Sequence, residues 1–428
     1  MQGKLTIEQI AQDIARVSEE TGIDISFLSG NKYVENGGLY SIKQMEKRGG
    51  INRIKNTLLR ETEKDLGQID KLKKTASYVN KLESKVGSKL NTEDLVREVI
   101  KGLNVKISPQ KLVKKTKDSG EKVQMVAMLN DLHYGLIVDP EENDNLNSYN
   151  FKEAGRRTAL FIKEIADYKP HKRKQVEKLH IVINGDLVEG ILRSGQGNDQ
   201  HLLTHQLNGA IHILTHALEY LKQDFEKIDI HCLAGNHDRM VHKNLGQRPT
   251  SELFDSYANI VYYALSAVFK PNKNINFFIP KTPYGFIDLP GGRMMYLHGD
   301  GLLNRQLGNP GKSINVGTVS NAIREFNAGE IAKGNQAVKL VLVGHTHGYS
   351  HFLTSDGVEV CVAPSICGVN GYAHMLNINT NLIAQVVFES TAKFIFGDSR
   401  LVRVNDADKD ASLDKIIPVY NKDLKWSK

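Results

Sequence analysis

The sequence predicts a layered α/β domain that follows a small, basic, α-helical region. Three observations lead to this fold class: apolar strand-like runs alternate with helix-length segments after residue 121, polar clusters stand where those runs end, and the surplus of positive charge lies before residue 121. The chain of 428 residues is long enough for two or three domains with buried cores. Its 40% apolar and 25% charged residues exclude collagen-like, mucin-like and wholly disordered proteins.

Residues 1–62 are expected to form a helical, DNA-binding domain. Apolar residues with a helical period occur at Ile7, Ile10, Ile14 and Val17. After the turn residues Asn36-Gly37-Gly38, residues 39–59 are predicted to form two short helices separated by Gly49-Gly50. Three short helices with a basic middle element suit a helix-turn-helix unit, and SIKQMEKRGGINRIK resembles the small DNA-binding repeats attached to homing endonucleases. A helical cap for protein interaction is the alternative.

The positive charge of the chain is concentrated in residues 1–120. This part holds 23 Lys and Arg against 16 Asp and Glu, which accounts for the whole net charge of +7, while the rest of the chain carries 33 of each. Basic segments on one appendage attract polyanions through counterion release, so we expect nucleic acid, and specifically DNA, to bind through residues 1–120. Residues 63–120 are read as a Lys-rich linker or arm, for which a solvated surface is the alternative.

Residues 121–400 are expected to form the catalytic domain. Its strands are predicted from apolar runs at 123–129, 179–184, 228–235, 294–299 and 338–344. Its helices are predicted at 151–167, 199–225, 252–269 and 313–327. Short runs after Gly348, including residues 392–397, are expected to form one edge of a second sheet. Residues 401–428 are polar and are expected to lie over the surface as a tail.

The sequence indicates a cytoplasmic protein. It has no uncharged apolar run of about 18 residues, so no membrane span is expected, and its first residues are too acidic and polar for a secretory signal. The three cysteines, Cys232, Cys361 and Cys367, are too few and too scattered for a disulfide framework or a thiolate zinc site. The oligomeric state is not indicated.

Polar clusters follow five of the apolar runs. They are Asp131-Leu-His133, Asn184-Gly-Asp186, Gly235-Asn-His-Asp238, His298-Gly-Asp300 and Gly344-His-Thr-His347. Ligands bind at the carboxyl ends of strands in open α/β sheets, so we expect the clusters to meet in one site. The mixture of Asp, His and Asn is typical of sites for Mn, Fe or Zn. It is not typical of calcium cages or of zinc sites built from thiolates. Within D-x-H and H-x-H, alternate residues of an extended segment project to the same side.

The ordered set D-x-H, G-D, G-N-H-D, H and G-H-x-H across residues 131–347 resembles the calcineurin-like metallophosphoesterases. The resemblance implies a metallophosphoesterase four-layer β-sandwich flanked by helices, with two metal ions bridged by one aspartate. It implies that the ligands of the first ion are Asp131, His133, Asp186 and His347. It implies that those of the second ion are Asp186, Asn236, His298 and His345.

The expected cofactors are two divalent ions, Mn²⁺ in the first place and Fe, Zn, Mg or Ni as alternatives. Two ions about 3.5 to 4 Å apart clamp a phosphate and lower the pKa of a water molecule for in-line attack. His237 resembles the catalytic histidine of the family, which donates a proton to the leaving group. Asp238 is expected to hold the ring of His237 through its other nitrogen.

The motif GDLVEGILRSGQGNDQ, with GNHD, HGD and GHTH, resembles the DNA-nuclease branch and especially the exonuclease subunit of archaeal family-D DNA polymerase. Double-strand-break repair nucleases place a histidine where this chain has Glu189. The protein-phosphatase motif G-D-x-V-D-R-G has an arginine that is absent here, and Arg193 or Arg239 can take its role. We therefore expect a DNA nuclease or exonuclease. A phosphatase or cyclic-nucleotide phosphodiesterase acting on small molecules or phosphoproteins is the alternative.

A histidine stripe follows the second cluster along the chain. It comprises His201, His205, His212 and His216, which share one face of the predicted helix 199–225. Partly buried, hydrogen-bonded histidines are the favoured interpretation over a third metal site. Within the stripe, His205 is the candidate for a contact with substrate.

Overall fold

The structure, a computed structural model, divides the chain into two units. It describes residues 27–28, 32–35, 38–41, 108, 122–168, 175–191, 201–240, 255–301, 303, 307, 314–370, 374 and 382–421. The units are Met1–Asn91 and Thr92–Lys428, so their boundary falls inside the predicted arm of residues 63–120.

The described part of the first unit is a three-stranded antiparallel sheet. Its strands are β1 (Phe27–Leu28), β2 (Lys32–Glu35) and β3 (Gly38–Ser41), in that spatial order. Glu35 pairs with Gly38, and the intervening Asn-Gly dipeptide is the sequence favoured in two-residue hairpin loops. The predicted helix at residue 39 is therefore wrong for residues 39–41, because the hairpin pairs them with β2. The other helices predicted before residue 121 lie outside the described residues.

The second unit contains two β-sheets. The six-stranded sheet has the order β14 (Ser399–Arg403), β13 (Ala384–Ser390), β4 (Lys122–Leu129), β5 (Gln175–Asn184), β6 (Ile228–Leu233) and β7 (Ile275–Phe278). The five-stranded sheet has the order β11 (Ser350–Leu353), β12 (Glu359–Val362), β10 (Val338–Val343), β9 (Gly292–Leu297) and β8 (Tyr284–Leu289). Strands β4 to β7 run parallel, as do β9, β10 and β12.

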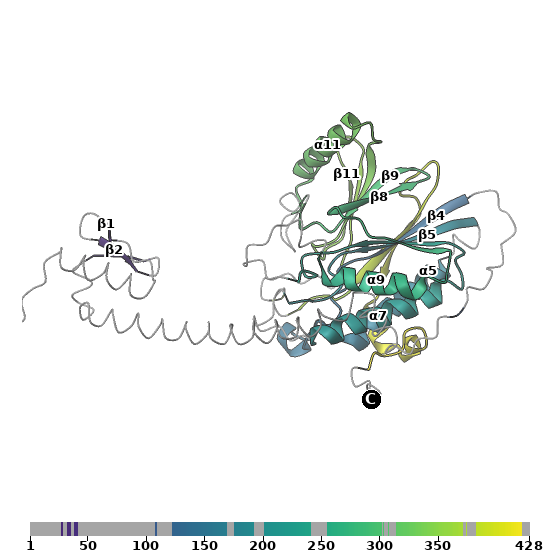
Figure 1. Ribbon diagram of the computed structural model, residues 1–428, viewed down its shortest axis with the longest axis horizontal. Coiled ribbons are helices and arrows are strands. Elements are labelled where there is room, and N and C mark those ends of the chain that lie inside the picture. The colour runs from purple at the N-terminus through teal and green to yellow at the C-terminus, as the bar shows by residue number, and fades with distance from the viewer. Residues whose placement is uncertain are drawn as a thin grey trace, which may run out of the picture. The chain divides into compact units, whose positions relative to one another are not determined.

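Helices cover the outer face of each sheet (Figure 1). Within the described residues these helices are α5 (Phe151–Asp167), α7 (Leu203–Leu221), α9 (Tyr257–Phe269) and α11 (Val316–Ala332). Buried side chains of α5, α7 and α9 form one core with the six-stranded sheet, and those of α11 form another with the five-stranded sheet. A short 3₁₀ helix, η1 (Pro140–Asn143), precedes α5. The helix and strand layers confirm the four-layer α/β sandwich predicted from the sequence.

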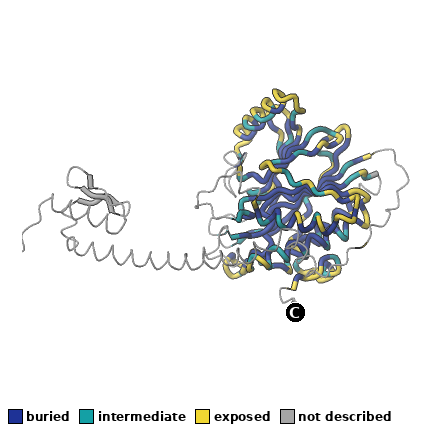
Figure 2. The backbone as a smooth tube through the Cα atoms, in the orientation of Figure 1, coloured by how far each residue is buried: buried dark blue, intermediate teal, exposed yellow. Residues whose placement is uncertain are grey.

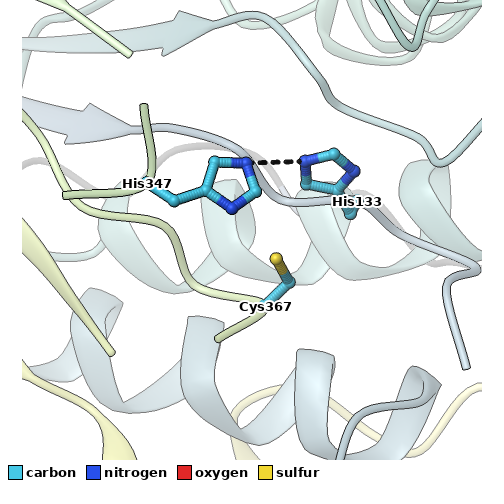
Figure 3. A group of neighbouring side chains, drawn as sticks. All are labelled: His133, His347 and Cys367. Carbon is cyan, nitrogen blue, oxygen red and sulfur yellow. Dashed lines mark hydrogen bonds between the residues drawn. The ribbon is translucent and has the colours of Figure 1, made fainter. Parts of the chain in front are cut away.

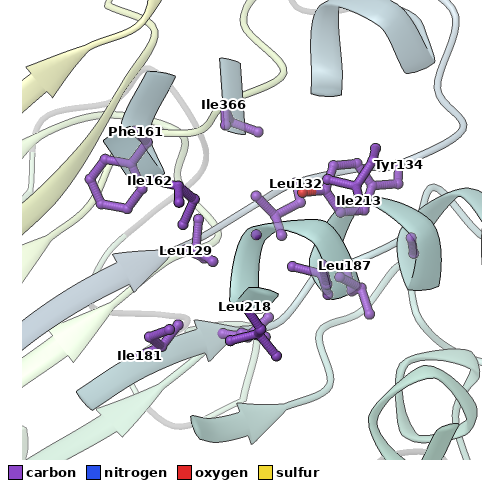
Figure 4. Close-up of a cluster of buried hydrophobic side chains, with 14 of the residues drawn as sticks. Leu129, Leu132, Tyr134, Phe161, Ile162, Ile181, Leu187, Ile213, Leu218 and Ile366 are labelled. Carbon is purple, nitrogen blue, oxygen red and sulfur yellow. The ribbon is translucent and has the colours of Figure 1, made fainter. Parts of the chain in front are cut away.

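The buried strands of the six-stranded sheet contribute to two cores at once (Figure 2). On β4, Met125 and Ala127 face the helices, while Val126 and Met128 pack against the other sheet. This follows from the alternation of side chains along a strand, and it explains why the parallel strands are almost continuously apolar. Figure 4 shows the helix-side core, in which Leu129 lies among residues of β5, α5 and α7.

The late strands differ from the sequence prediction in two respects. Strand β13 lies beside β4 in the six-stranded sheet, whereas β11 and β12 belong to the second sheet as expected. Residues 392–397, predicted as a strand, form a turn between β13 and β14. The amide of Thr391 donates to the carbonyl of Phe394 at 2.9 Å, and that of Gly397 to the carbonyl of Glu389 at 2.8 Å. The turn reverses the chain so that β14 can pair with β13.

The segment predicted as a surface tail, 401–428, is part of the domain as far as residue 421. It completes β14 and continues into two 3₁₀ helices, η3 (Asn405–Lys409) and η4 (Ala411–Lys415). Leu413 and Ile417 are buried in the helix-side core. Of the helices in the described part of the chain, none combines the length and the apolar character needed to cross a membrane.

Candidate metal centre

The five polar clusters lie in the loops at the carboxyl ends of β4, β5, β6, β9 and β10. In that order the loops supply Asp131 and His133, Asp186, Asn236, His298, and His345 with His347. Hydrogen bonds tie the loops together. The amide of His133 donates to the carbonyl of Asp186 at 2.9 Å, and the amide of His345 donates to the carboxylate of Asp131 at 3.0 Å. Both sheets therefore contribute to one site.

Four of these residues form a first ligand cluster. The ligand atoms of Asp131, His133, Asp186 and His347 all lie within 4.8 Å of one another. The Nε2 atoms of His133 and His347 are 3.3 Å apart, and Figure 3 shows the two rings turned toward each other. Oδ1 of Asp131 lies 3.6 Å from Nε2 of His347, and Oδ2 of Asp186 lies 3.7 Å from Nε2 of His133. This is the set expected for the first ion.

A second cluster shares Asp186 with the first. The ligand atoms of Asp186, His298 and His345 lie within 4.8 Å of one another. Nε2 of His298 is 3.3 Å from Oδ2 of Asp186 and 3.2 Å from Oδ1 of Asn236. Because Asp186 belongs to both clusters, its carboxylate occupies the position of a bridge between two ions.

Hydrogen bonds fix the tautomers of two of the histidines. Nδ1–H of His133 donates to the carboxylate of Glu189 at 2.8 Å, and Nδ1–H of His298 donates to the carbonyl of Asn184 at 2.8 Å. In each ring Nε2 then faces the cluster. A carboxylate or carbonyl behind a ligating histidine is the usual arrangement in metal sites, because it orients the ring and raises its basicity.

The ligand loops have an unusual backbone. Five of the ligands have a positive φ, namely Asp131 (49°), His133 (44°), Asp186 (48°), His345 (70°) and His347 (59°). Such conformations are uncommon outside glycine and cluster at functional sites. They also revise the sequence argument about D-x-H and H-x-H. Both members of each pair reach the centre through left-handed turns and not through the alternation of an extended segment.

Two glycines let these loops approach closely. A Cβ on Gly235 would lie 2.2 Å from Oδ1 of Asp186. A Cβ on Gly185, whose φ is +88°, would lie 2.6 Å from Nδ1 of His298. Any side chain at either position would displace a ligand.

The charge states of most groups in the pocket fit metal binding. Burial lowers the pKa of His345 to about 4, and burial together with His133 lowers the pKa of His347 well below its usual value. Burial alone would raise the pKa of Asp186, but the positive charge of His298 holds it well below its usual range, and Asp186 in turn holds the pKa of His298 well above its usual value. Neutral imidazoles and an ionised carboxylate are the forms that bind metal, so an ion at the second position would displace the proton of His298. The donor set, its spacing and the shared aspartate therefore fit two divalent cations.

The predicted catalytic histidine lies against the first cluster. The ring centroids of His237 and His133 are 4.7 Å apart, and the backbone amide of His237 donates to Oδ1 of Asp186 at 2.8 Å. Nδ1 of His237 donates to the backbone carbonyl of Glu189 at 3.1 Å and lies 3.4 Å from its carboxylate. Glu189 thus faces a candidate metal ligand and the candidate proton donor together.

The role expected for Asp238 is corrected by its contacts. Its carboxylate accepts hydrogen bonds from the backbone amides of Gly235 at 2.7 Å, Val188 at 3.1 Å and Leu187 at 3.3 Å. It therefore ties the loop after β6 to the loop after β5. Glu189, and not Asp238, lies beside Nδ1 of His237.

The three candidate substrate residues differ in position. Arg239 pairs with Asp300 at 3.0 Å, and Asp300 follows His298 by two residues, so this arginine lies beside the second cluster. His205 is half-buried in the first turn of α7. The neighbouring Gln206 accepts a hydrogen bond from the amide of Gly190 in the loop after β5 at 2.8 Å. Arg193 lies outside the described residues.

The other members of the histidine stripe on α7 have structural contacts. The ring of His201 stacks on Phe151, with centroids 4.8 Å apart. Nε2 of His212 donates to the carbonyl of Pro418 at 2.7 Å, and the His212 and His216 rings meet edge to face. These contacts agree with the interpretation of the stripe as packed, hydrogen-bonded histidines.

A further His–Asp–His group lies between the sheets, away from the carboxyl ends of the strands. His180 and His231 share a hydrogen bond of 2.9 Å beside Asp229. The carboxylate of Asp229 is already bound by Lys178 at 2.6 Å and by Asn276 at 2.8 Å. Because these groups satisfy one another and include a lysine, they form a polar network and not a third metal site.

Comparisons with known proteins give distant similarities only. No family model matches the sequence, and no match is found among curated protein sequences. Among solved structures, the chain is similar to a protein of Streptococcus pneumoniae TIGR4 that is described as a predicted phosphoesterase. The sequence identity is 12%, the alignment covers 66% of this chain and 98% of that chain, and the TM-score is 0.25.

Two other solved structures are described as hydrolases of phosphate compounds. A dimetal phosphatase from Danio rerio has 10% identity, with 66% of this chain and 99% of that chain covered and a TM-score of 0.33. A 5'-nucleotidase from Candida albicans SC5314 has 12% identity, with 65% of this chain and 48% of that chain covered and a TM-score of 0.26. At such low identities and scores, we infer function from the site itself.

Two residues at the site were missed by sequence reasoning. Glu189 stands three residues after Asp186, where the double-strand-break nucleases have a histidine, and that correspondence was a usable signal. Cys367 lies beside His133 and His347 (Figure 3), but it follows no strand-end cluster. The loop that holds Cys367 reaches the centre only through tertiary contacts, so no sequence pattern predicted this residue.

Proposed function

We propose that this chain is a two-metal phosphoesterase that hydrolyses phosphodiester bonds. The main observation behind the proposal is that the buried carboxylate of Asp186 belongs to both ligand clusters. Two divalent ions, when bound, polarise a phosphate and lower the pKa of a water molecule. Mn²⁺ is the ion we propose for assays, since carboxylate, amide and imidazole donors accept it.

The protein groups around the clusters supply the remaining functions. His237 is oriented through Nδ1 by the carbonyl of Glu189, and its ring would exchange a proton with the leaving oxygen through Nε2. Arg239 lies beside the second cluster and offers positive charge to a non-bridging phosphate oxygen. The glycine-lined loops leave the ligands preorganised, so little rearrangement precedes the reaction.

We further propose that the substrate is DNA and that the enzyme is a nuclease or exonuclease. The charge distribution supports this substrate, because residues 1–120 carry the entire net charge of +7. DNA recruited by this part of the chain would raise the local concentration of phosphodiesters at the centre.

A set of substrates tests the reaction. Purified protein with Mn²⁺ is given bis-p-nitrophenyl phosphate, p-nitrophenyl phosphate, cyclic nucleotides, and end-labelled single- and double-stranded DNA. We expect cleavage of the diester and of DNA, and the product lengths distinguish exonuclease from endonuclease action. Hydrolysis of the monoester alone favours the alternative phosphatase function, and hydrolysis of cyclic nucleotides without DNA cleavage favours a small-molecule phosphodiesterase.

Removal of the first unit tests recruitment. The truncation is best placed after Asn91, because Ser108 hydrogen-bonds to Glu219 at 3.0 Å and accepts from Lys222. We expect the truncated protein to keep its activity on bis-p-nitrophenyl phosphate and to lose the salt-dependent part of its DNA affinity. Unchanged DNA affinity would exclude the first unit as the binding element.

A further inference from the structure

We propose that the thiolate of Cys367 is an additional ligand of the first metal position, next to His133 and His347. The inference rests on the metal-binding part of the proposed function. It concerns a sulfur atom that lies outside the strand-end clusters.

The sulfur lies beside two of the four residues of the first cluster. Sγ of Cys367 and the ring nitrogens of His133 and His347 all lie within 4.8 Å of one another, and Figure 3 shows the sulfur directed toward the gap between the rings. Two nitrogens on one ion at about 2.1 Å and a tetrahedral angle are about 3.4 Å apart. The two Nε2 atoms are 3.3 Å apart. A sulfur bound to the same ion at about 2.3 Å lies about 3 to 4.4 Å from such nitrogens, which is within the 4.8 Å that bounds the present separations.

The backbone of Cys367 is held firmly from its other side. Nη1 of Arg157 donates to the carbonyls of Ile366 at 3.0 Å and Cys367 at 3.2 Å. The side-chain amide of Asn147 donates to the carbonyls of Cys367 and Val369, both at 2.8 Å. These bonds bind the carbonyls of the loop on one side, and the thiol extends toward the histidines on the other.

The anchoring network is itself buried and charged. Arg157 is 1% exposed, and its guanidinium pairs with Asp408 at 2.6 Å. The guanidinium is planar, so its N–H donors have a fixed geometry. Because they bind a carboxylate and the loop carbonyls together, they hold the loop in one conformation. Cys367 is thereby presented to the centre as a preorganised side chain.

The contacts of the thiol within its own loop are weak. Its sulfur lies 3.7 Å from the hydroxyl of Ser365 and 3.6 Å from the carbonyl of Gly368, as in the weak hydrogen bonds that a thiol makes. When a cation binds, the thiol releases its proton to solvent and the sulfur forms one coordinate bond to the ion. Because thiolate is a soft ligand, it favours Zn²⁺, Fe²⁺ or Co²⁺ over Mn²⁺ or Mg²⁺ at the first position.

Cobalt substitution tests this directly. Metal-free, full-length protein is titrated with Co²⁺, and a sulfur-to-cobalt charge-transfer band in the near ultraviolet reports the Co–S bond. We expect the band to grow with one of two bound equivalents in wild type. It should be absent in Cys367→Ser and Cys367→Ala and unchanged in Cys361→Ser, a matched substitution of a buried cysteine on β12.

A metal competition gives a second readout. Cys367→Ser should lose at least about ten-fold in affinity for Zn²⁺ at one site, with a smaller change for Mn²⁺. Two bound cobalt equivalents without the band in wild type would overturn the ligand inference and leave the dinuclear centre standing. Absence of cobalt binding would overturn both. The wild-type spectrum decides even if the Cys367 variants fail to fold, which circular dichroism would show.

Discussion

Glu189→Gln is the most informative substitution at this centre. Glu189 is 2% exposed, and its carboxylate accepts Nδ1–H of His133 at 2.8 Å and lies 3.4 Å from Nδ1 of His237. Burial alone would raise the pKa of Glu189, but the adjacent His237 and His133 hold it well below its usual value, so the group is ionised at neutral pH. Glutamine keeps the size and one acceptor oxygen but removes the negative charge.

The expected effect is a loss of both metal affinity and turnover. Substituting the partner behind a metal-ligating histidine typically costs about 10- to 100-fold in affinity or activity, which corresponds to about 1.4 to 2.7 kcal/mol. Since the charge also stabilises the protonated form of the neighbouring His237, we expect the basic limb of the kcat profile to move to lower pH. A residue with only a packing role would not move that limb.

The assay compares kcat–pH profiles with bis-p-nitrophenyl phosphate and metal affinities measured by calorimetry. Glu330→Gln is the matched control. Glu330 is a buried carboxylate on α11, and it pairs with Arg293 at 3.1 Å. This substitution should change the stability of the protein without changing the kcat–pH profile. If Glu189→Gln has wild-type metal affinity and an unshifted profile, Glu189 does not position the two histidines and the reasoning fails.

Three further predictions concern the loops and the sheet interface. His237→Ala should keep both metal equivalents, counted by mass spectrometry, while turnover falls about 10²- to 10⁴-fold; loss of metal would show that His237 is a ligand. Gly235→Ala should lose metal binding, because its Cβ would lie 2.2 Å from Oδ1 of Asp186. Burial lowers the pKa of His180 to about 4 and that of His231 to about 3. The folded protein therefore binds fewer protons than the unfolded chain, and its stability falls as the pH drops below the histidine pKa of the unfolded chain. For His180 the loss between about pH 7 and pH 5 is about 2 kcal/mol, and urea unfolding should show a weaker pH dependence in His180→Gln than in wild type.

The sheet strands were predictable because their signal is local. A parallel strand covered on both faces is apolar at nearly every position, so β4, β5, β6, β9 and β10 could be placed to within a few residues from the sequence. The meeting of their polar ends also follows, since parallel strands end at the same edge of a sheet. The partner of β13 was not predictable. Its apolar pattern suits either sheet, and its pairing with β4 joins residues more than 250 positions apart, which no local pattern specifies.

The C-terminal segment shows why polar sequence alone misplaces an element. Residues 401–421 contain few apolar side chains, yet they pack on α5 through specific ion pairs. Arg156 binds Asp414 at 2.7 Å and Arg157 binds Asp408 at 2.6 Å. Such pairs join residues more than 200 positions apart, so no local sequence pattern predicts them. Because Arg157 also holds the loop of Cys367, the C-terminal segment contributes indirectly to the shape of the centre.

The meeting of the candidate ligands was predictable from the sequence, but the backbone geometry that aims them at one centre was not. Alternation along an extended segment was expected to aim both residues of D-x-H and H-x-H at one centre, whereas Asp131, His133, His345 and His347 all have a positive φ. Asp and Asn, with His, are the residues other than glycine that best tolerate this region, so ligand chemistry and backbone tolerance select the same residue types. Replacing such a ligand with alanine therefore removes a donor and also leaves a left-handed turn to a residue that disfavours it. The metal-free stability of these variants, compared with wild type, isolates the effects that do not depend on an ion, namely the backbone strain and the loss of hydrogen bonds such as the one from the amide of His345 to Asp131.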